Sequence, residues 1–157
     1  IAVSSTRVRS LVASGDLGGA HTLLGEGYPI IGKVVAGERR GRQIGFPTAN
    51  VHIDIKQKLM PPPGVYAGWA TTATGSCGAV VNFGSRPTVD GRDLRLEAHL
   101  LDFEGDLYDT HLKLDLVYRL RDEAKFESLN QLKHQITTDV DKAKSLLHSR
   151  ESTTTRR

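Results

Sequence analysis

The sequence predicts a mainly β protein: a six-stranded antiparallel barrel of the Greek-key type, with short helices before it and a C-terminal helix packed on it. Apolar and polar residues alternate over several short segments between residues 30 and 117, which is typical of half-buried strands. Turn-like connections separate these segments, and no helical pattern lies between them. A parallel sheet would need crossover helices there, so the strands are expected to be antiparallel.

Two short helices are expected before the barrel, within residues 4–24. A hydroxyl side chain at positions 4–6 can cap the first helix, and Gly15 is placed to end it. Asp16 can cap the second helix, whose apolar residues share one face.

The strands are expected in the middle of the chain, at residues 30–35, 51–55, 65–72, 77–83, 94–100 and 112–117. Ser128 and Gln131 then form a capping-box pattern at the start of the last helix. Apolar residues recur at helical spacing up to Leu147 and form one stripe. From Ser149 no residue suits a core, so residues 149–157 are predicted to be a disordered tail.

Composition limits the function classes. A chain of 157 residues with 38% apolar and 25% charged residues is typical of one globular domain. The single cysteine, Cys77, rules out an internal disulfide and favours a reducing compartment, so a cytoplasmic location is expected. No apolar run is long enough to span a bilayer. A net charge of +3 with 6% aromatic residues fits phosphorylated small molecules better than nucleic acid, so neither a membrane nor a nucleic-acid partner is expected.

The segment 37–50 combines three glycines with three arginines. Its sequence is Gly-Glu-Arg-Arg-Gly-Arg-Gln-Ile-Gly-Phe-Pro-Thr-Ala-Asn. Glycine lets backbone N–H groups approach a ligand closely, and arginine brings positive charge, so the segment suggests a phosphate-binding loop. It has neither the lysine of a Walker loop nor the spacing of the dinucleotide fingerprint. From composition alone, a solvated turn explains it equally well.

Five motifs in the same order and spacing resemble riboflavin kinase, and more closely the kinase module of the bacterial bifunctional riboflavin kinase/FAD synthetases. The resemblance covers roughly residues 25–147. The motifs are Gly-Phe-Pro-Thr-Ala-Asn at 45–50, Gly-Val-Tyr-Ala-Gly-Trp at 64–69, Asn-Phe-Gly-Ser-Arg-Pro-Thr at 82–88, Glu-Ala-His-Leu-Leu-Asp-Phe at 97–103, and 121–126 followed by Ser128-Leu129.

The N-terminus carries a second resemblance. Residues 4–9, Ser-Ser-Thr-Arg-Val-Arg, look like the late Ser-Ser-Thr-x-x-Arg motif of the adenylyltransferase module in the same enzymes. Residues 1–24 would then be a helical remnant or linker of that module, and 25–148 the riboflavin kinase domain. The module's earlier His-containing nucleotide motif is absent, so the chain alone is not expected to have adenylyltransferase activity, and the module is expected upstream in the full-length protein. A capped helix start explains residues 4–9 as well.

The resemblance implies transfer of the ATP γ-phosphate to the 5′-hydroxyl of the ribityl chain of riboflavin, which gives FMN and ADP. It assigns Glu97 as the general base and gives the Thr48 hydroxyl and the Asn50 carbonyl to Mg²⁺. Without the resemblance, Glu97 would be a solvated residue on the polar face of a strand, Thr48 the start of a strand, and Asn50 a turn cap.

The remaining site residues also follow from the resemblance. The family often has lysine where this chain has Arg42, and Asp122-Glu123-Ala124 departs from some relatives in the flavin pocket. Nucleotide binding is implied for Gly37, Gly41, Arg42, Gly45, Phe46, Pro47, Thr48, Asn50, Leu100, Asp102 and Tyr108. Flavin binding is implied for Asn50, Glu97, Arg121, Phe126 and Ser128.

Two other functions remain open from the sequence. The chain could be a flavin-binding regulatory module that lacks independent catalysis. It could also be a small basic barrel that binds nucleic acid through Arg39, Arg40 and Arg42, although the low aromatic content argues against base stacking.

Overall fold

The computed structural model describes residues 5–24, 27–35, 48–53, 60–88, 91–103, 105 and 107–155. Within these ranges the chain forms helices α1 and α2, six strands, and a long C-terminal helix α4. The elements are α1 (Ser5–Ser14), α2 (Leu17–Leu24), β1 (Tyr28–Val35), β2 (Ala49–His52), β3 (Gly64–Thr72), β4 (Gly75–Thr88), β5 (Gly91–Leu100), β6 (His111–Arg121) and α4 (Leu129–Thr155).

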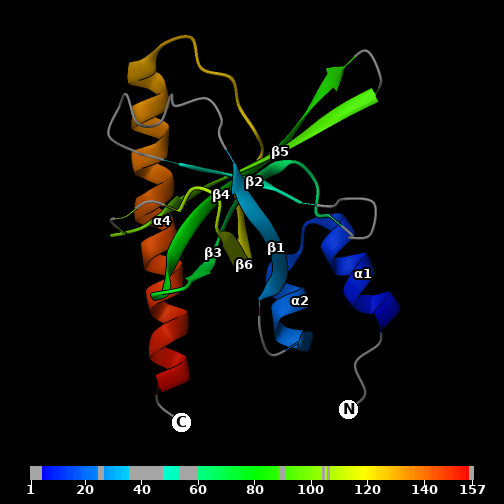
Figure 1. Ribbon diagram of the computed structural model, residues 1–157. Helices are drawn as coiled ribbons and strands as arrows, with labels where there is room; N and C mark the ends of the chain where they lie inside the picture. Colours follow the sequence, from blue (N-terminus) through cyan, green and yellow to red (C-terminus); the bar gives the residue numbers. More distant parts are fainter. Residues whose placement is uncertain are drawn as a thin grey trace.

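The six strands close into a barrel in the order β1-β2-β5-β4-β3-β6, and β6 pairs with β1 to complete it. Every neighbouring pair is antiparallel. Figure 1 shows α4 running along one side of the barrel. Helices α1 and α2 pack together on a different side of the barrel from α4. The predicted fold class is confirmed.

Strand bounds differ from the expected ones at several ends. Strand β1 begins at Tyr28 and includes Pro29, whose pairing in the described residues is with β6 alone, so its missing N–H costs no bond toward β2. Strand β2 begins at Ala49, before the expected start at residue 51, and ends at His52, while residues 54–55 of the expected strand lie outside the described part of the chain. Strand β4 continues to Thr88. Side-chain alternation detects only the half-buried part of a strand, whereas backbone pairing with the neighbouring strand sets its length.

The barrel is packed on both faces of its wall. An inner cluster fills the barrel and includes Ile30, Tyr66 and Leu114, each 0% exposed. An outer cluster joins the wall to α4 and includes Val65 and Leu147, each 2% exposed. Because successive strand residues point to opposite faces, β3 supplies Tyr66 to the inside and Val65 to the outside.

Three predicted helix ends are confirmed: the end of α1 and the starts of α2 and α4. Gly15 ends α1 with φ of 87°, a backbone conformation that favours glycine. The N–H of Gly19 donates to Asp16 Oδ1 at 2.8 Å and caps α2. At the start of α4 the N–H of Gln131 donates to Ser128 Oγ at 3.1 Å, and Gln131 Oε1 accepts from Glu127 N at 3.1 Å.

The predicted tail from Ser149 is wrong for residues 149–155, because α4 continues to Thr155. The apolar stripe ends at Leu147, but no glycine or proline follows it. Helical hydrogen bonding can therefore continue past the last contact with the barrel. No described helix is both long enough and apolar enough to cross a membrane.

The close approach of β3 to β6 requires glycine at position 68. A Cβ atom at Gly68 would lie 2.1 Å from the backbone oxygen of Asp115. We expect Gly68→Ala to lower the free energy of unfolding by about 1–3 kcal/mol, as overpacking does elsewhere. Chemical denaturation measures this change. Gly18→Ala is the matched control, since its nearest contact is 3.9 Å away and alanine favours the helix; equal stability of the two variants would contradict the prediction.

Candidate active site

Three polar residues occupy one row across neighbouring strands. Asn50 of β2 is the register partner of Glu97 on β5, and Glu97 is in turn the partner of Asn82 on β4. Directly paired residues of antiparallel strands point to the same face, with Cβ atoms about 4.5–5.5 Å apart. Their neighbours Val51 and Leu96 belong to the inner cluster, so the row faces outward. The structure thus brings together Asn50 and Glu97, which the resemblance assigned to the metal and to proton transfer.

Thr48 lies directly before β2, two positions from Asn50, and both residues are half-buried. A hydroxyl and an amide carbonyl are the hard oxygen ligands that Mg²⁺ accepts, so the donor set fits this ion. The remaining loop residues with an assigned role lie outside the described part of the chain: Gly37, Gly41, Arg42, Gly45, Phe46 and Pro47.

Tyr108 lies in the connection from β5 to β6 and is 60% exposed. The next residue anchors this connection to β1: Asp109 N donates to Val34 O at 2.9 Å, and Lys33 Nζ lies 2.8 Å from Asp109 Oδ1. The hydrogen bond from Lys33 lowers the pKa of the Asp109 carboxyl. Val35, at the end of β1, is also the register partner of Asn50. Tyr108 therefore lies on a connection held at the end of β1 that carries the partner of Asn50.

The other two residues assigned to the nucleotide lie near the end of β5. Leu100 is 7% exposed and belongs to the inner cluster, so any contact from it to a nucleotide would use its backbone. Asp102 has a positive φ of 54° and an exposed side chain, whose Oδ1 lies 3.6 Å from Lys144 Nζ on α4.

Cys77 is half-buried and packs against the inner cluster. Burial raises the pKa of its thiol, which makes Cys77 a poor nucleophile at neutral pH.

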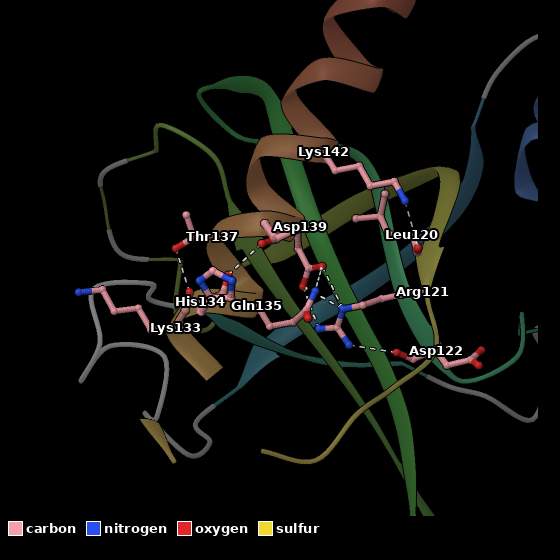
Figure 2. Close-up of polar contacts among 10 residues, drawn as sticks. Leu120, Arg121, Asp122, Lys133, His134, Gln135, Thr137, Asp139 and Lys142 are labelled. Carbon is pink, nitrogen blue, oxygen red and sulfur yellow. Dashed lines mark hydrogen bonds and ion pairs between the residues drawn. The ribbon is translucent and has the colours of Figure 1, made fainter. Parts of the chain in front are cut away.

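Arg121 ends β6 and is held by a buried carboxylate of α4 (Figure 2). Its Nε donates to Asp139 Oδ1 at 2.9 Å, and its Nη2 donates to Asp139 Oδ2 at 2.8 Å. Gln135 Nε2 donates to the same carboxylate at 3.0 Å. Asp139 is 4% exposed, so this is a buried, two-point ion pair.

The segment after β6 is attached to Arg121 at both ends. Arg121 Nη1 donates to the carbonyl of Asp122 at 3.0 Å, and its guanidinium lies 5.8 Å from the centre of the Phe126 ring. Ser128 follows, and its hydroxyl serves as the cap of α4. The structure therefore groups Arg121, Phe126 and Ser128, three of the five flavin residues of the resemblance, around one segment.

This segment lies against the outer face of β4. A Cβ atom at Gly84 would come within 2.2 Å of Glu123 Oε2, so the Glu123 carboxylate lies directly over that glycine. Gly84 is two positions from Asn82 and shares its face. The segment 122–126 therefore extends to the strand face that carries the row containing Glu97.

Sequence reasoning assigned no role to two residues of this region. Asn82 is flanked by the apolar residues Val81 and Phe83, and this alternation places it on the outer face, but its pairing with Glu97 is not a local signal. Asp139 follows Ile136 by three positions, which puts a charged residue on the apolar stripe of α4. A charged residue within an apolar stripe indicates that its side chain is buried against a residue of opposite charge.

The chain is similar in sequence to known proteins. The family model for Flavokinase: Riboflavin kinase matches residues 24–147. A bifunctional riboflavin kinase/FMN adenylyltransferase of Haemophilus influenzae is 40% identical over 148 residues, which cover 94% of this chain and 47% of that protein. Its counterpart in Escherichia coli K12 is 43% identical over 140 residues, which cover 88% of this chain and 44% of that protein. The chain spans about half the length of the curated relatives it matches.

Two solved structures are similar in fold. Riboflavin kinase from Trypanosoma brucei superposes with a TM-score of 0.57 at 26% identity, covering 78% of this chain and 81% of that one. A Streptococcus pneumoniae protein described as a macrolide-efflux protein superposes with a TM-score of 0.82 at 35% identity, covering 88% of this chain and 45% of that one. The family match over residues 24–147, on a barrel that pairs Asn50 with Glu97, shows that the chain belongs to the riboflavin kinase family.

Proposed function

We propose that this chain transfers the γ-phosphoryl group of ATP to the 5′-hydroxyl of the ribityl chain of riboflavin, producing FMN and ADP. The observation that carries the proposal is the pairing of Asn50 with Glu97 on adjacent strands of a family member. Phosphoryl transfer depends on alignment and charge neutralisation rather than on covalent participation of the protein. The carboxylate of Glu97 would accept a proton, and the neutral oxygen atoms of Thr48 and Asn50 would bind a metal ion that holds the phosphates.

Glu97 is the general base in this mechanism. Its carboxylate accepts the proton of the ribityl hydroxyl as that oxygen bonds to the γ-phosphorus, and the bond from phosphorus to the β–γ bridging oxygen breaks to release ADP. Asn82, on the other side of Glu97 from Asn50, can donate an amide hydrogen bond that orients the carboxylate or a ribityl hydroxyl.

Thr48 and Asn50 would hold Mg²⁺ together with the phosphates, and the ion would neutralise charge on the transferred group. The glycines and Arg42 of the preceding loop would bind the phosphates through backbone N–H groups and charge. Asp102 and Tyr108 would lie on the nucleotide side, with Leu100 contributing backbone. Arg121, Phe126 and Ser128 would shape the flavin side.

The proposal extends to the surroundings of the chain. Its bifunctional relatives carry an FMN adenylyltransferase function in addition to the kinase, so we propose an upstream adenylyltransferase module in the full-length protein. The segment 1–24 would link the two modules. The reaction uses ATP and the chain carries one cysteine, which fits a cytoplasmic location.

The direct test is incubation of the folded chain with riboflavin, ATP and Mg²⁺, followed by chromatography. FMN formation at the expense of ATP is the expected result. Folded protein that quenches riboflavin fluorescence but forms no FMN would instead establish a flavin-binding module without catalysis.

The metal assignment has its own test. Thr48→Val removes the hydroxyl and keeps the branched shape, so we expect the Mg²⁺ concentration for half-maximal activity to rise roughly tenfold, equivalent to about 1.4 kcal/mol of binding. Thr48→Ser is the matched control, because it retains the hydroxyl, and should keep the original Mg²⁺ requirement. Titration of FMN formation with Mg²⁺ at saturating riboflavin measures both. A Val variant with unaltered Mg²⁺ dependence would remove Thr48 from the metal site.

A further inference from the structure

The ion pair between Arg121 and Asp139 lies in line with the row that contains Glu97. Asn82, the partner of Glu97, pairs with Val65 on β3, and Val65 pairs with Arg121 on β6. The series Glu97, Asn82, Val65 and Arg121 therefore crosses four adjacent strands. Val65 belongs to the outer cluster, so this series lies on the outer face of the barrel, which α4 contacts at β3, β4 and β6.

Asp139 fixes the orientation of Arg121, the last residue of this series. Among the described residues it is the one buried charged side chain, with 4% exposed, and it contacts Arg121 at two oxygens. Removing a buried charge from water costs free energy, which only well-aligned partners recover. Arg121 and Gln135 supply those partners, so the carboxylate holds the guanidinium in one orientation.

The fixed guanidinium in turn organises the segment 122–126. It binds the carbonyl of Asp122 and lies against Phe126, so both ends of the segment are attached to one side chain (Figure 2 shows the Asp122 contact). Arg119 adds a second contact at the first end, where its Nη2 lies 2.7 Å from Asp122 Oδ1. Between the two attachments, Glu123 lies over Gly84 of β4.

We propose that Asp139 is a positioning residue of the substrate site: through Arg121 it holds the segment 122–126 against the outer face of β4, beside the row containing Glu97. This inference rests on the proposed kinase activity. A segment that is attached at Asp122 and Phe126 and lies beside the row containing Glu97 determines how riboflavin is presented to that carboxylate. Loss of the Asp139 carboxylate weakens the two attachments made by Arg121 and leaves Arg119 as the contact at Asp122.

The central variant is Asp139→Asn, which keeps the shape of the side chain and removes its charge. We expect the KM for riboflavin to rise at least roughly tenfold, the fold-change of one charge-assisted hydrogen bond, while the KM for ATP stays unchanged. Gln135→Leu removes only the supporting amide and should raise the riboflavin KM in the same direction by less. It also decides the question if Asp139→Asn does not fold.

Leu147→Ala is the matched control, because it weakens the docking of the same helix through the outer cluster, away from the segment 122–126. Its riboflavin KM should remain that of the unmodified chain. Hydrogen exchange of the amides of 122–126 should accelerate in Asp139→Asn and not in Leu147→Ala. An unchanged riboflavin KM in both Asp139→Asn and Gln135→Leu, or an equal rise in Leu147→Ala, would overturn the proposal.

The hydrogen-exchange measurement and the kinetics distinguish a failure of the proposed function from a failure of this inference. An unmodified chain that forms no FMN would contradict the proposed function, while faster exchange in Asp139→Asn would still support the positioning of the segment. An unmodified chain that forms FMN, with an Asp139→Asn variant that binds riboflavin equally well, would contradict this inference alone.

Discussion

Replacement of Glu97 by glutamine is expected to lower kcat for FMN formation by about 10²–10⁴-fold, the contribution of a positioned general base. Glutamine keeps the size of the side chain and its capacity to accept a hydrogen bond at the carbonyl oxygen, but it cannot take up the proton of the ribityl hydroxyl. The affinity for riboflavin, measured by fluorescence quenching without ATP, should therefore change little. The result is a loss in kcat with nearly constant binding.

The same strand offers a matched control. His99 follows Glu97 by two positions, so it shares the outer face, and its register partner is Val80 of the outer cluster rather than a polar residue. His99→Gln should retain kcat close to that of the unmodified chain. An unchanged kcat in Glu97→Gln, or a loss of similar size in both variants, would remove Glu97 as the base.

The row of Asn50, Glu97 and Asn82 shows what local sequence can predict about the site and what it cannot. The leucine alternation around Glu97 places its side chain on a polar face, and the Pro-Thr-Ala-Asn motif marks the residues around Asn50. Register between β2, β5 and β4 is a non-local property set by closure of the barrel, so alternation alone does not bring these three residues together. The family resemblance joined Asn50 to Glu97 because it carries information about the whole fold, and it left Asn82 without a role.

The helices show the same division between local and non-local information. Gly15, Asp16 and Ser128 determine helix ends through backbone conformation and short-range hydrogen bonds, and these ends were predicted correctly. The end of α4 was not, because the apolar stripe reports packing and the helix outlasts its packing. The ion pair of Arg121 with Asp139 joins a strand end to a helix position, which no local pattern encodes.

Leu17 makes the second large prediction, which concerns the extent of the folded unit. Its side chain is 0% exposed and belongs to the inner cluster of the barrel, although Leu17 precedes both the expected start of the kinase domain at residue 25 and the start of the family match at residue 24. Helix α2 contacts both β1 and β6, the two strands that close the barrel. Helix α2 thus contributes Leu17 to the core of the barrel, although the segment 1–24 is expected to be a helical remnant or linker.

We expect Leu17→Ala to lower the free energy of unfolding by about 2–5 kcal/mol, since it removes a fully buried leucine from a closed core. A domain of this kind has a total free energy of unfolding of about 5–15 kcal/mol, so this loss should also lower the highest temperature at which the chain still forms FMN. Trp69, the single tryptophan, packs against the outer cluster on β3, so its fluorescence reports unfolding of the barrel itself. Arg9→Ala, an exposed change in α1, is the control and should shift the free energy of unfolding by less than about 0.5 kcal/mol. If Leu17→Ala left the Trp69 transition in place, α2 would be a detachable linker; a shift of that transition would make α2 a structural part of the kinase barrel, and a chain beginning at residue 25 would lose part of its core.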